Sequence, residues 1–426
     1  MKPARAGRLP RAPRPGAPAR AAGVPLALAA APWLTLALAG PAAATDRFDP
    51  SQSPPSFSST RWERTERLED PHPALVQEPF LPLLEHRLPE IVEAFGGDAS
   101  PPSSQALLHY ARGWKEADPE LPPVLLVHGA GLTANHCFAD RPFEQPHSGL
   151  AARLSADRRA VFAITFAHPH GDNVLQAELL ADAIARVRHV TGAAKVDLVA
   201  HSKGGMSARI YLSNAGREWS TRYRGDVRRY VMLGTPNGGL DVSFAYPNLN
   251  YWILQHGVAA PLSFTAGYYY GRWTEWRAQS VYKEGAFPGQ AQMLARWDRR
   301  YGRTRAKGQV DVDTTYDGGK GQVSVSLGIE RAIADGGHFM AHLARHGVDP
   351  EVELAVLAGT SPWILGMVGE RRGPSDGLLL VASAWDTAAL TSRGARLLRK
   401  DALFLNHLQL VYDPRANDWV AEVLAQ

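Results

Sequence analysis

Length, composition and charge already exclude several classes of protein. The chain has 426 residues, 45% of them hydrophobic and 21% charged, which is enough to bury a large core, so a disordered chain is not expected. The formal net charge of +4 includes six basic residues within the first 20 positions, so the rest of the chain carries −2 and nucleic acid is not an expected partner. Cys137 is the single cysteine, so no intrachain disulfide can form, and we expect its thiol to be a buried apolar group.

The first 44 residues have the pattern of a signal peptide. The basic residues are followed by an apolar stretch over residues 24–39 and then by Pro41-Ala42-Ala43-Ala44, which predicts cleavage before Thr45. A membrane anchor is the alternative, but the stretch of about 16 residues contains Pro25 and Pro32 and is short for about 30 Å of hydrocarbon. We therefore expect a secreted protein, extracellular or periplasmic.

The mature chain divides into two parts. Residues 45–73 are rich in Pro, Ser and charge, and predict a flexible N-terminal extension. Residues 74–426 contain the apolar patterns of a folded domain. Leucines recur at roughly helical spacing over residues 74–95, although three prolines would break or kink a helix there.

Short apolar runs alternate with helical patterns in the main part of the chain. The expected strands are residues 123–127, 160–166, 196–200, 230–233, 353–357 and 402–405. The expected helices are residues 172–187, 329–345 and 417–424. This alternation predicts an α/β fold with a mostly parallel sheet flanked by helices.

The alternation lapses over residues 240–327, which are unusually aromatic and predict an inserted cap. The cap residues that we take as candidates for binding substrate are Tyr246, Trp252, Tyr269 and Trp273. An equally open interpretation is that these aromatic side chains only pack the cap against the body of the domain.

The expected strand over residues 196–200 leads to a serine with the surroundings of a nucleophile. The sequence Val-Asp-Leu-Val-Ala-His-Ser-Lys-Gly-Gly ends an apolar run at Ser202 and passes into a helix-forming stretch. A nucleophile on such a sharp strand-to-helix turn needs small neighbours, and these are Ala200, Gly204 and Gly205. Ala200 replaces the first glycine of the G-x-S-x-G pattern.

A nucleophilic serine also needs a base, an acid and donors for the oxyanion. His407 follows the last expected strand and is the candidate base. Asp376 is the candidate acid because it precedes that histidine in the order Ser, Asp, His, and Asp241 is its rival. The backbone N–H groups of Ala130 and Lys203 are the candidate oxyanion donors.

Two histidines adjoin these segments. His128 lies in the glycine-rich turn and His201 precedes the nucleophile, so both are candidates for contact with substrate.

Two further clusters raise the question of a metal. His338, His342 and His346 are spaced by four residues, but no carboxylates converge with them in the sequence, so we interpret them as solvated or capping side chains. Asp311, Asp313 and Asp317 are interpreted as a polar turn, because a calcium loop needs further ligands at fixed spacing. We expect no metal and no cofactor.

Five segments together resemble the secreted bacterial lipases and esterases of the α/β-hydrolase superfamily. They are Leu126-Val127-His128-Gly129-Ala130-Gly131, Ala200-His201-Ser202-Lys203-Gly204-Gly205, Leu233-Gly234-Thr235-Pro236-Asn237-Gly238-Gly239, Ser375-Asp376-Gly377-Leu378 and Asn406-His407-Leu408. The resemblance implies an α/β-hydrolase fold and a Ser202, Asp376, His407 triad. Two departures concern the lipases that bind a structural calcium, because Gln409 stands where they carry an aspartate and Cys137 cannot form their disulfide.

The sequence therefore predicts a secreted serine hydrolase, a lipase or esterase, that acts on carboxylic esters with an apolar acyl part. A transient contact with a lipid interface is compatible with this prediction, and the oligomeric state is not indicated. A polyester depolymerase or an acyltransferase could use the same three residues. A catalytically inactive binding module is the alternative from another class, and it predicts no labelling of Ser202 by a fluorophosphonate.

Overall fold

The computed structural model describes residues 47–139, 148–269, 271–303, 309–364 and 366–426. The expected signal peptide over residues 1–44 lies outside them. Within this described part of the chain, no helix combines the length and the hydropathy that are needed to cross a membrane.

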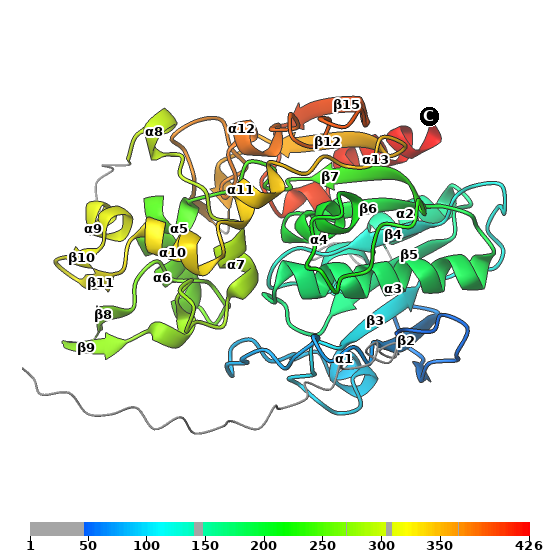
Figure 1. Cartoon of the computed structure of the whole chain (residues 1–426), viewed down its shortest axis with the longest axis horizontal. Coiled ribbons are helices and arrows are strands. Elements are labelled where there is room, and N and C mark those ends of the chain that lie inside the picture. The colour runs from blue at the N-terminus through cyan, green and yellow to red at the C-terminus, as the bar shows by residue number, and fades with distance from the viewer. Residues whose placement is uncertain (1–46, 140–147, 270, 304–308, 365) are drawn as a thin grey trace, which may run out of the picture. The chain divides into compact units, whose positions relative to one another are not determined.

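The described residues form a nine-stranded sheet in the order β1-β2-β3-β5-β4-β6-β7-β12-β15 (Figure 1). The strands are β1 (Ser56–Phe57), β2 (Arg64–Glu69), β3 (Gln105–Tyr110), β4 (Val124–Val127), β5 (Val161–Phe166), β6 (Val196–His201), β7 (Val227–Leu233), β12 (Glu353–Gly359) and β15 (Arg396–Leu403). The six strands from β5 to β15 in this order are parallel, whereas β3 is antiparallel to both β2 and β5. A mostly parallel sheet flanked by helices is confirmed.

Helices cover both faces of this sheet, which explains why β4, β5 and β6 are continuous apolar runs. On one face α3 (Asn173–Thr191) and α4 (Lys203–Leu212) pack against strand residues such as Leu125 and Leu198. On the other face α2 (Leu150–Ala156) and α13 (Pro414–Ala425) pack against their neighbours Leu126 and Val199. Cys137 is buried on this second face, as expected.

Two expected helices are shorter than their sequence patterns. The pattern over residues 74–95 yields only α1 (Pro89–Ala94), because prolines interrupt the preceding residues and a proline is accepted in the first turn. The helix expected over residues 329–345 is split into α10 (Ile329–Asp335) and α11 (Phe339–Leu343). Gly336 and Gly337 separate them, and Gly337 has φ +72°.

The N-terminal part corrects one prediction. We expected a flexible extension over residues 45–73, but the described part of it, residues 47–73, contains β1 and β2, and β2 pairs along its whole length with β3. The composition is misleading because a charged side chain of β2 points inward. Glu66 is buried and accepts hydrogen bonds from Arg186 of α3, at 2.8 and 2.9 Å, and from the Tyr110 hydroxyl.

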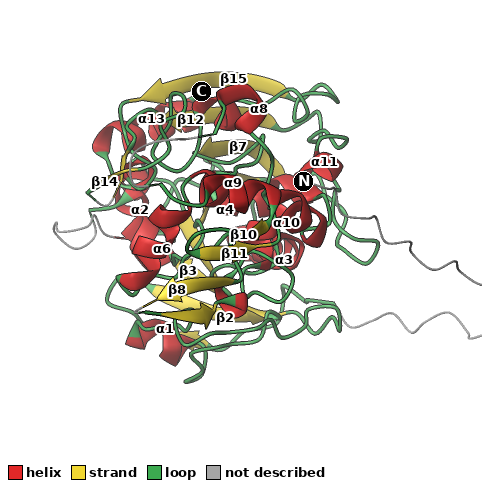
Figure 2. Cartoon of the chain, turned by 90° about the vertical axis from the view of Figure 1, so that its left-hand side faces the viewer, coloured by secondary structure: helices red, strands yellow, loops and turns green. Residues whose placement is uncertain are grey.

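The chain between β7 and β12 forms separate small elements. They are α5 (Val242–Ala245), α6 (Pro247–Gln255), β8 (Ala266–Tyr269), β9 (Arg272–Glu275), α7 (Pro288–Gln292), α8 (Asp298–Tyr301), α9 (Val312–Asp317), β10 (Gly319–Lys320), β11 (Ser324–Ser326), α10 and α11. Four of the strands form a second sheet in the order β10-β11-β8-β9 (Figure 2). We call residues 240–327 of this insertion the cap.

Three short elements follow β12. They are β13 (Trp363–Ile364), β14 (Met367–Val368) and α12 (Val381–Ala384). The chain passes through them before it returns to the sheet as β15.

Candidate active site

Ser202 lies on a strained turn between β6 and α4. Its backbone has φ +52° and ψ −127°, in the left-handed half of conformational space that residues with a side chain rarely adopt. A Cβ at Gly204 would lie 2.3 Å from the His128 carbonyl oxygen, and one at Gly205 would lie 2.1 Å from Thr235 Oγ1. The two glycines are therefore required by close packing, whereas Ala200 is accommodated within the buried strand.

Three side chains from distant parts of the sequence are joined by hydrogen bonds at this turn. His407 Nε2 lies 2.7 Å from Ser202 Oγ, and His407 Nδ1 lies 2.7 Å from Asp376 Oδ2. Asp376 follows β12 and His407 follows β15, so both arise from the carboxyl ends of parallel strands. The serine, histidine and aspartate expected from the sequence are thus brought together.

The loop around Asp376 fixes the direction of the imidazole. Asp376 Oδ1 accepts hydrogen bonds from the amides of Leu378, at 3.0 Å, and Leu379, at 2.7 Å, which leaves Oδ2 for the histidine. The Asp376 carbonyl also accepts a hydrogen bond from the His407 amide at 2.8 Å. A Cβ at Gly234 would lie 3.2 Å from His407 Nδ1 and 3.3 Å from Asp376 Oδ2, so the absence of a side chain there gives the pair its space.

Asp241, the rival acid, has a different role. It is buried in the cap, where it pairs with Arg372 and accepts hydrogen bonds from the Tyr316 hydroxyl and, at 3.0 Å, from the Trp297 amide. With these partners Asp241 does not orient His407.

The two candidate oxyanion donors flank the serine. A Cβ at Gly129 would lie 3.0 Å from Ser202 Cβ, which shows how closely the turn after β4 approaches the elbow. The Ala130 amide follows in this turn, and the Lys203 amide is the first of α4, where the helix leaves N–H groups unpaired. Within the described residues neither amide donates a hydrogen bond to the protein. The Lys203 side chain is buried and donates to Gln176, and burial lowers its pKa.

An apolar cavity of about 350 Å³ opens at Ser202 and His407. Its walls come from the body and from the cap, and most of them are aliphatic. The lining includes Leu132, Leu240, Val242, Ile253, Ala259 and Leu294. Sequence patterns missed these residues, and the one available signal was the aliphatic pair Leu240 and Val242 directly after a strand that reaches the site.

The aromatic candidates of the cap do not line this cavity. Tyr246 belongs to the buried core of the cap, and Trp252 packs at its edge and against the ring of His256. Tyr269 packs edge-on against its aromatic neighbours in the cap, and Trp273 lies on β9 with 43% of its surface exposed. Tyr246 and Trp252 therefore fit the alternative interpretation, in which large aromatic side chains build the core of the cap.

The two candidate histidines differ. His201 lines the cavity, and its Nε2 lies 3.0 Å from the His407 carbonyl. His128 does not line the cavity: its Nε2 accepts a hydrogen bond from the Phe166 amide at 3.1 Å, and burial lowers its pKa to about 3. His170, which follows β5, is a further lining residue, and its buried Nε2 has no hydrogen-bond partner within the described part of the chain.

The three histidines considered as metal ligands, His338, His342 and His346, lie in local backbone surroundings. His342 Nε2 lies 3.0 Å from the Ala215 carbonyl, and His346 Nδ1 lies 2.9 Å from the His342 carbonyl. His338 occupies the residue before α11 with φ +51°.

The carboxylates of Asp311, Asp313 and Asp317 also have partners nearby. Asp313 and Asp317 both pair with Arg303, at 3.0 and 2.7 Å. Asp311 accepts hydrogen bonds from the amides of Gln322 and Val323, at 2.7 and 2.8 Å.

The order of the strands and the position of the serine together define the fold. The turn at Ser202 follows a central parallel strand, and Asp376 and His407 follow later strands in the order Ser, Asp, His. The protein has the α/β-hydrolase fold. In this fold ligands bind at the carboxyl edge of the sheet, where the cavity lies.

Comparisons with known proteins find similarities at low sequence identity. The family model described as "Domain of unknown function (DUF7379)" matches residues 100–250. The mature lipase BlEst2 of Bacillus licheniformis is 16% identical, with a TM-score of 0.41 over 72% of this chain and 94% of that chain. The esterase RhEst1 of Rhodococcus sp. ECU1013 is 12% identical, with a TM-score of 0.37 over 76% and 95%. Lipase B of Aspergillus fumigatus is 14% identical, with a TM-score of 0.38 over 81% and 60%.

Proposed function

We propose that the protein is a serine hydrolase that cleaves carboxylic esters with an apolar acyl part. The observation that carries this proposal is the Ser202–His407–Asp376 hydrogen-bonded chain at the mouth of an aliphatic cavity. The α/β-hydrolase fold suggests hydrolysis, and the cavity suggests the substrate.

The geometry assigns a role to each group. Ser202 Oγ attacks the ester carbonyl while His407 Nε2 accepts its proton, and the same imidazolium then protonates the leaving alcohol. Asp376 keeps the proton of His407 on Nδ1 and stabilises the imidazolium. The Ala130 and Lys203 amides donate to the oxyanion of the tetrahedral intermediate. Water, activated by His407, then hydrolyses the acyl-enzyme.

The acyl chain would enter the aliphatic cavity. Each methylene that is transferred from water to such a surface contributes about 0.8 kcal/mol. A cavity of about 350 Å³ is at the small end of the range for ligand sites and suits a chain better than a bulky polymer segment. This favours a lipase or esterase over a polyester depolymerase.

Secretion and contact with a lipid interface belong to the same proposal. The pattern of residues 1–44 supports secretion. Val258 lines the cavity and is exposed, and Tyr268 and Trp273 are exposed on the small sheet. An exposed apolar side chain that lines an apolar cavity, with further exposed aromatic side chains on the same cap, favours a substrate that is presented at a lipid surface.

Rates on nitrophenyl esters of rising acyl length test the proposal, for wild type, Ser202→Ala and Ser392→Ala. Ser392 is exposed and does not line the cavity, so its variant should retain wild-type rates. We expect Ser202→Ala to lose at least about 10³-fold in kcat and to lose labelling by a fluorophosphonate. Activity that survives Ser202→Ala would refute the mechanism, and a preference for the shortest esters would leave an esterase in place of a lipase.

A further inference from the structure

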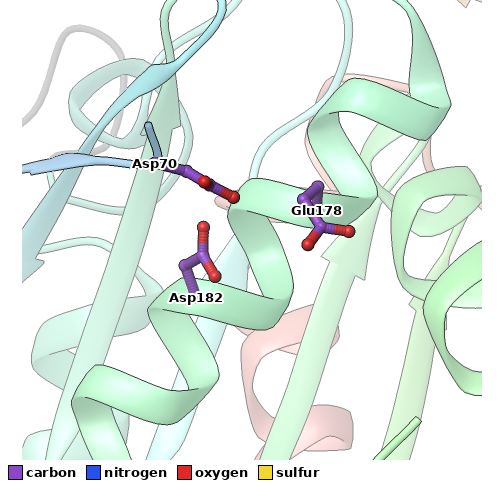
Figure 3. A group of neighbouring side chains, drawn as sticks. All are labelled: Asp70, Glu178 and Asp182. Carbon is purple, nitrogen blue, oxygen red and sulfur yellow. The ribbon is translucent and has the colours of Figure 1, made fainter. Parts of the chain in front are cut away.

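Three buried carboxylates meet on the side of the molecule where the N-terminal strands join α3. Asp70 directly follows β2, and Glu178 and Asp182 lie one turn apart on α3 (Figure 3). One oxygen from each residue lies within 4.8 Å of the other two, and the three residues are only 1%, 2% and 4% exposed. No part of the proposed catalytic mechanism uses them.

Two of these carboxylates are incompletely paired. Asp70 Oδ1 accepts a hydrogen bond from the His72 amide at 2.8 Å. Asp70 Oδ2 and Asp182 Oδ2 are buried, and neither has a hydrogen-bond partner among the residues that the structure describes. Figure 3 shows the carboxylates of Asp70 and Asp182 pointing toward each other. Glu178 is paired with Arg47 at 3.0 Å and accepts hydrogen bonds from Thr221.

The neighbouring arginines do not neutralise the facing pair. Arg47 is engaged by Glu178, and Arg224 donates to Asp226 and to the Ala181 carbonyl. Buried carboxylates that face each other need a cation or a shared proton between them.

We propose that Asp70, Glu178 and Asp182 bind a divalent cation of the oxygen-preferring class, Ca²⁺. Three carboxylates carry three negative charges, of which Arg47 offsets one and a divalent cation offsets two. Ligand oxygens within 4.8 Å of one another fit an ion that is held at about 2.3–2.6 Å from each. A set made only of carboxylates favours Ca²⁺ over the metals that select imidazole or thiolate.

Of the three carboxylates, Glu178 lines a cavity of about 300 Å³ that is open to solvent, whereas Asp70 and Asp182 do not line it. An ion would therefore approach from the side of Glu178. The bound ion would tie the end of β2 to the middle of α3. Its main effect would therefore be on stability, and the site stands independently of the proposed esterase activity.

Calorimetric titration with CaCl₂ and thermal unfolding test this site on full-length protein stripped with a chelator. We expect one ion bound per chain and a Tm that rises by about 3–6 °C at saturating Ca²⁺. Asp182→Asn should lose both responses. Asp313→Asn should keep them, because Asp313 is an exposed carboxylate paired with Arg303.

Asp70→Asn provides a second test if Asp182→Asn does not fold. A wild-type protein without binding heat and without a Tm shift would overturn the proposal, and it would show that Asp70 and Asp182 share a proton instead. An undiminished response to Ca²⁺ in either variant would also overturn it, because the ion would then bind elsewhere.

Discussion

At the residue scale, the small residues around Ser202 are of two kinds. Gly204 must be glycine, whereas Ala200 need only have a small side chain. Gly204 faces the backbone of the His128 turn, and a side chain there would have to displace a carbonyl group. Ala200 lies inside β6, where its methyl group is buried without displacing the turn. The departure from the G-x-S-x-G pattern is therefore structurally neutral.

This difference predicts opposite results for two small substitutions. Gly204→Ala should destabilise the protein by about 1–3 kcal/mol and lower kcat/KM by about 10-fold or more, because the turn must shift. Ala200→Gly should cost about 0.5–1 kcal/mol and leave kcat/KM within about twofold. Urea unfolding and rates on a soluble ester measure both effects, and equal losses of activity in the two variants would contradict the packing argument.

The chain positions of the site residues could be predicted from the sequence, because parallel strands bring their carboxyl ends to one edge. This constraint is sufficient to predict Ser202, Asp376 and His407 as neighbours from the sequence alone. It could not separate Asp376 from Asp241 by contact. That distinction depends on Arg372, which lies 131 residues from Asp241 in the sequence and pairs with it in the cap.

At the element scale, the cap shows where composition misleads. Its aromatic side chains form a core, whereas aliphatic residues of α6 and of the following loop line the cavity. Periodicity identifies which residues of a short element are apolar, but it does not tell which of two apolar surfaces, the core or the cavity, they face. The expected strands were short but apolar on both faces, so they were predicted far better than the cap.

Ala259 and Trp273 distinguish the cavity from the outer surface of the cap. Ala259→Phe places a ring in the cavity and should reduce kcat/KM for long-chain esters by about 10-fold or more relative to butyrate, since contact with two or more methylenes is lost. Trp273→Ser, on the exposed strand β9, should leave the chain-length profile on soluble esters unchanged. If the dependence of kcat/KM on acyl length changed in Trp273→Ser and not in Ala259→Phe, the aliphatic cavity would not be the acyl-binding site.

At the scale of the whole molecule, the fold buries many titratable groups that the sequence presents as ordinary polar residues. Glu66 of β2 and Arg186 of α3 form a buried ion pair, so the charged composition of β2 does not indicate a buried strand. Histidines are buried in the same way, and burial lowers the pKa of His109 and His128 to about 3 and that of His168 to about 4. None of these values could be read from the sequence, because each depends on the surroundings of the folded side chain.

These histidines predict an acid-sensitive fold. Above pH 6.5 they are neutral in both the folded and the unfolded chain, and their full contribution to stability is present. As the pH falls from 6.5 toward 4, the unfolded chain binds protons that the folded chain cannot, so the free energy of unfolding decreases by about 1.4 kcal/mol per pH unit for each histidine. For His109, His128 and His168 together the slope approaches about 4 kcal/mol per pH unit near pH 5.

Urea unfolding between pH 7 and 4.5 measures this slope in wild type, His109→Asn and His189→Asn. His109 is held between Thr65 Oγ1 and Thr165 Oγ1, at 2.9 and 2.8 Å, so its replacement also lowers stability at neutral pH. The informative quantity is therefore the slope, which should fall by about 1.4 kcal/mol per pH unit in His109→Asn. His189 is exposed on α3 and should leave the slope unchanged. A wild-type slope in His109→Asn would mean that carboxylates, and not buried histidines, set the acid limit of this fold.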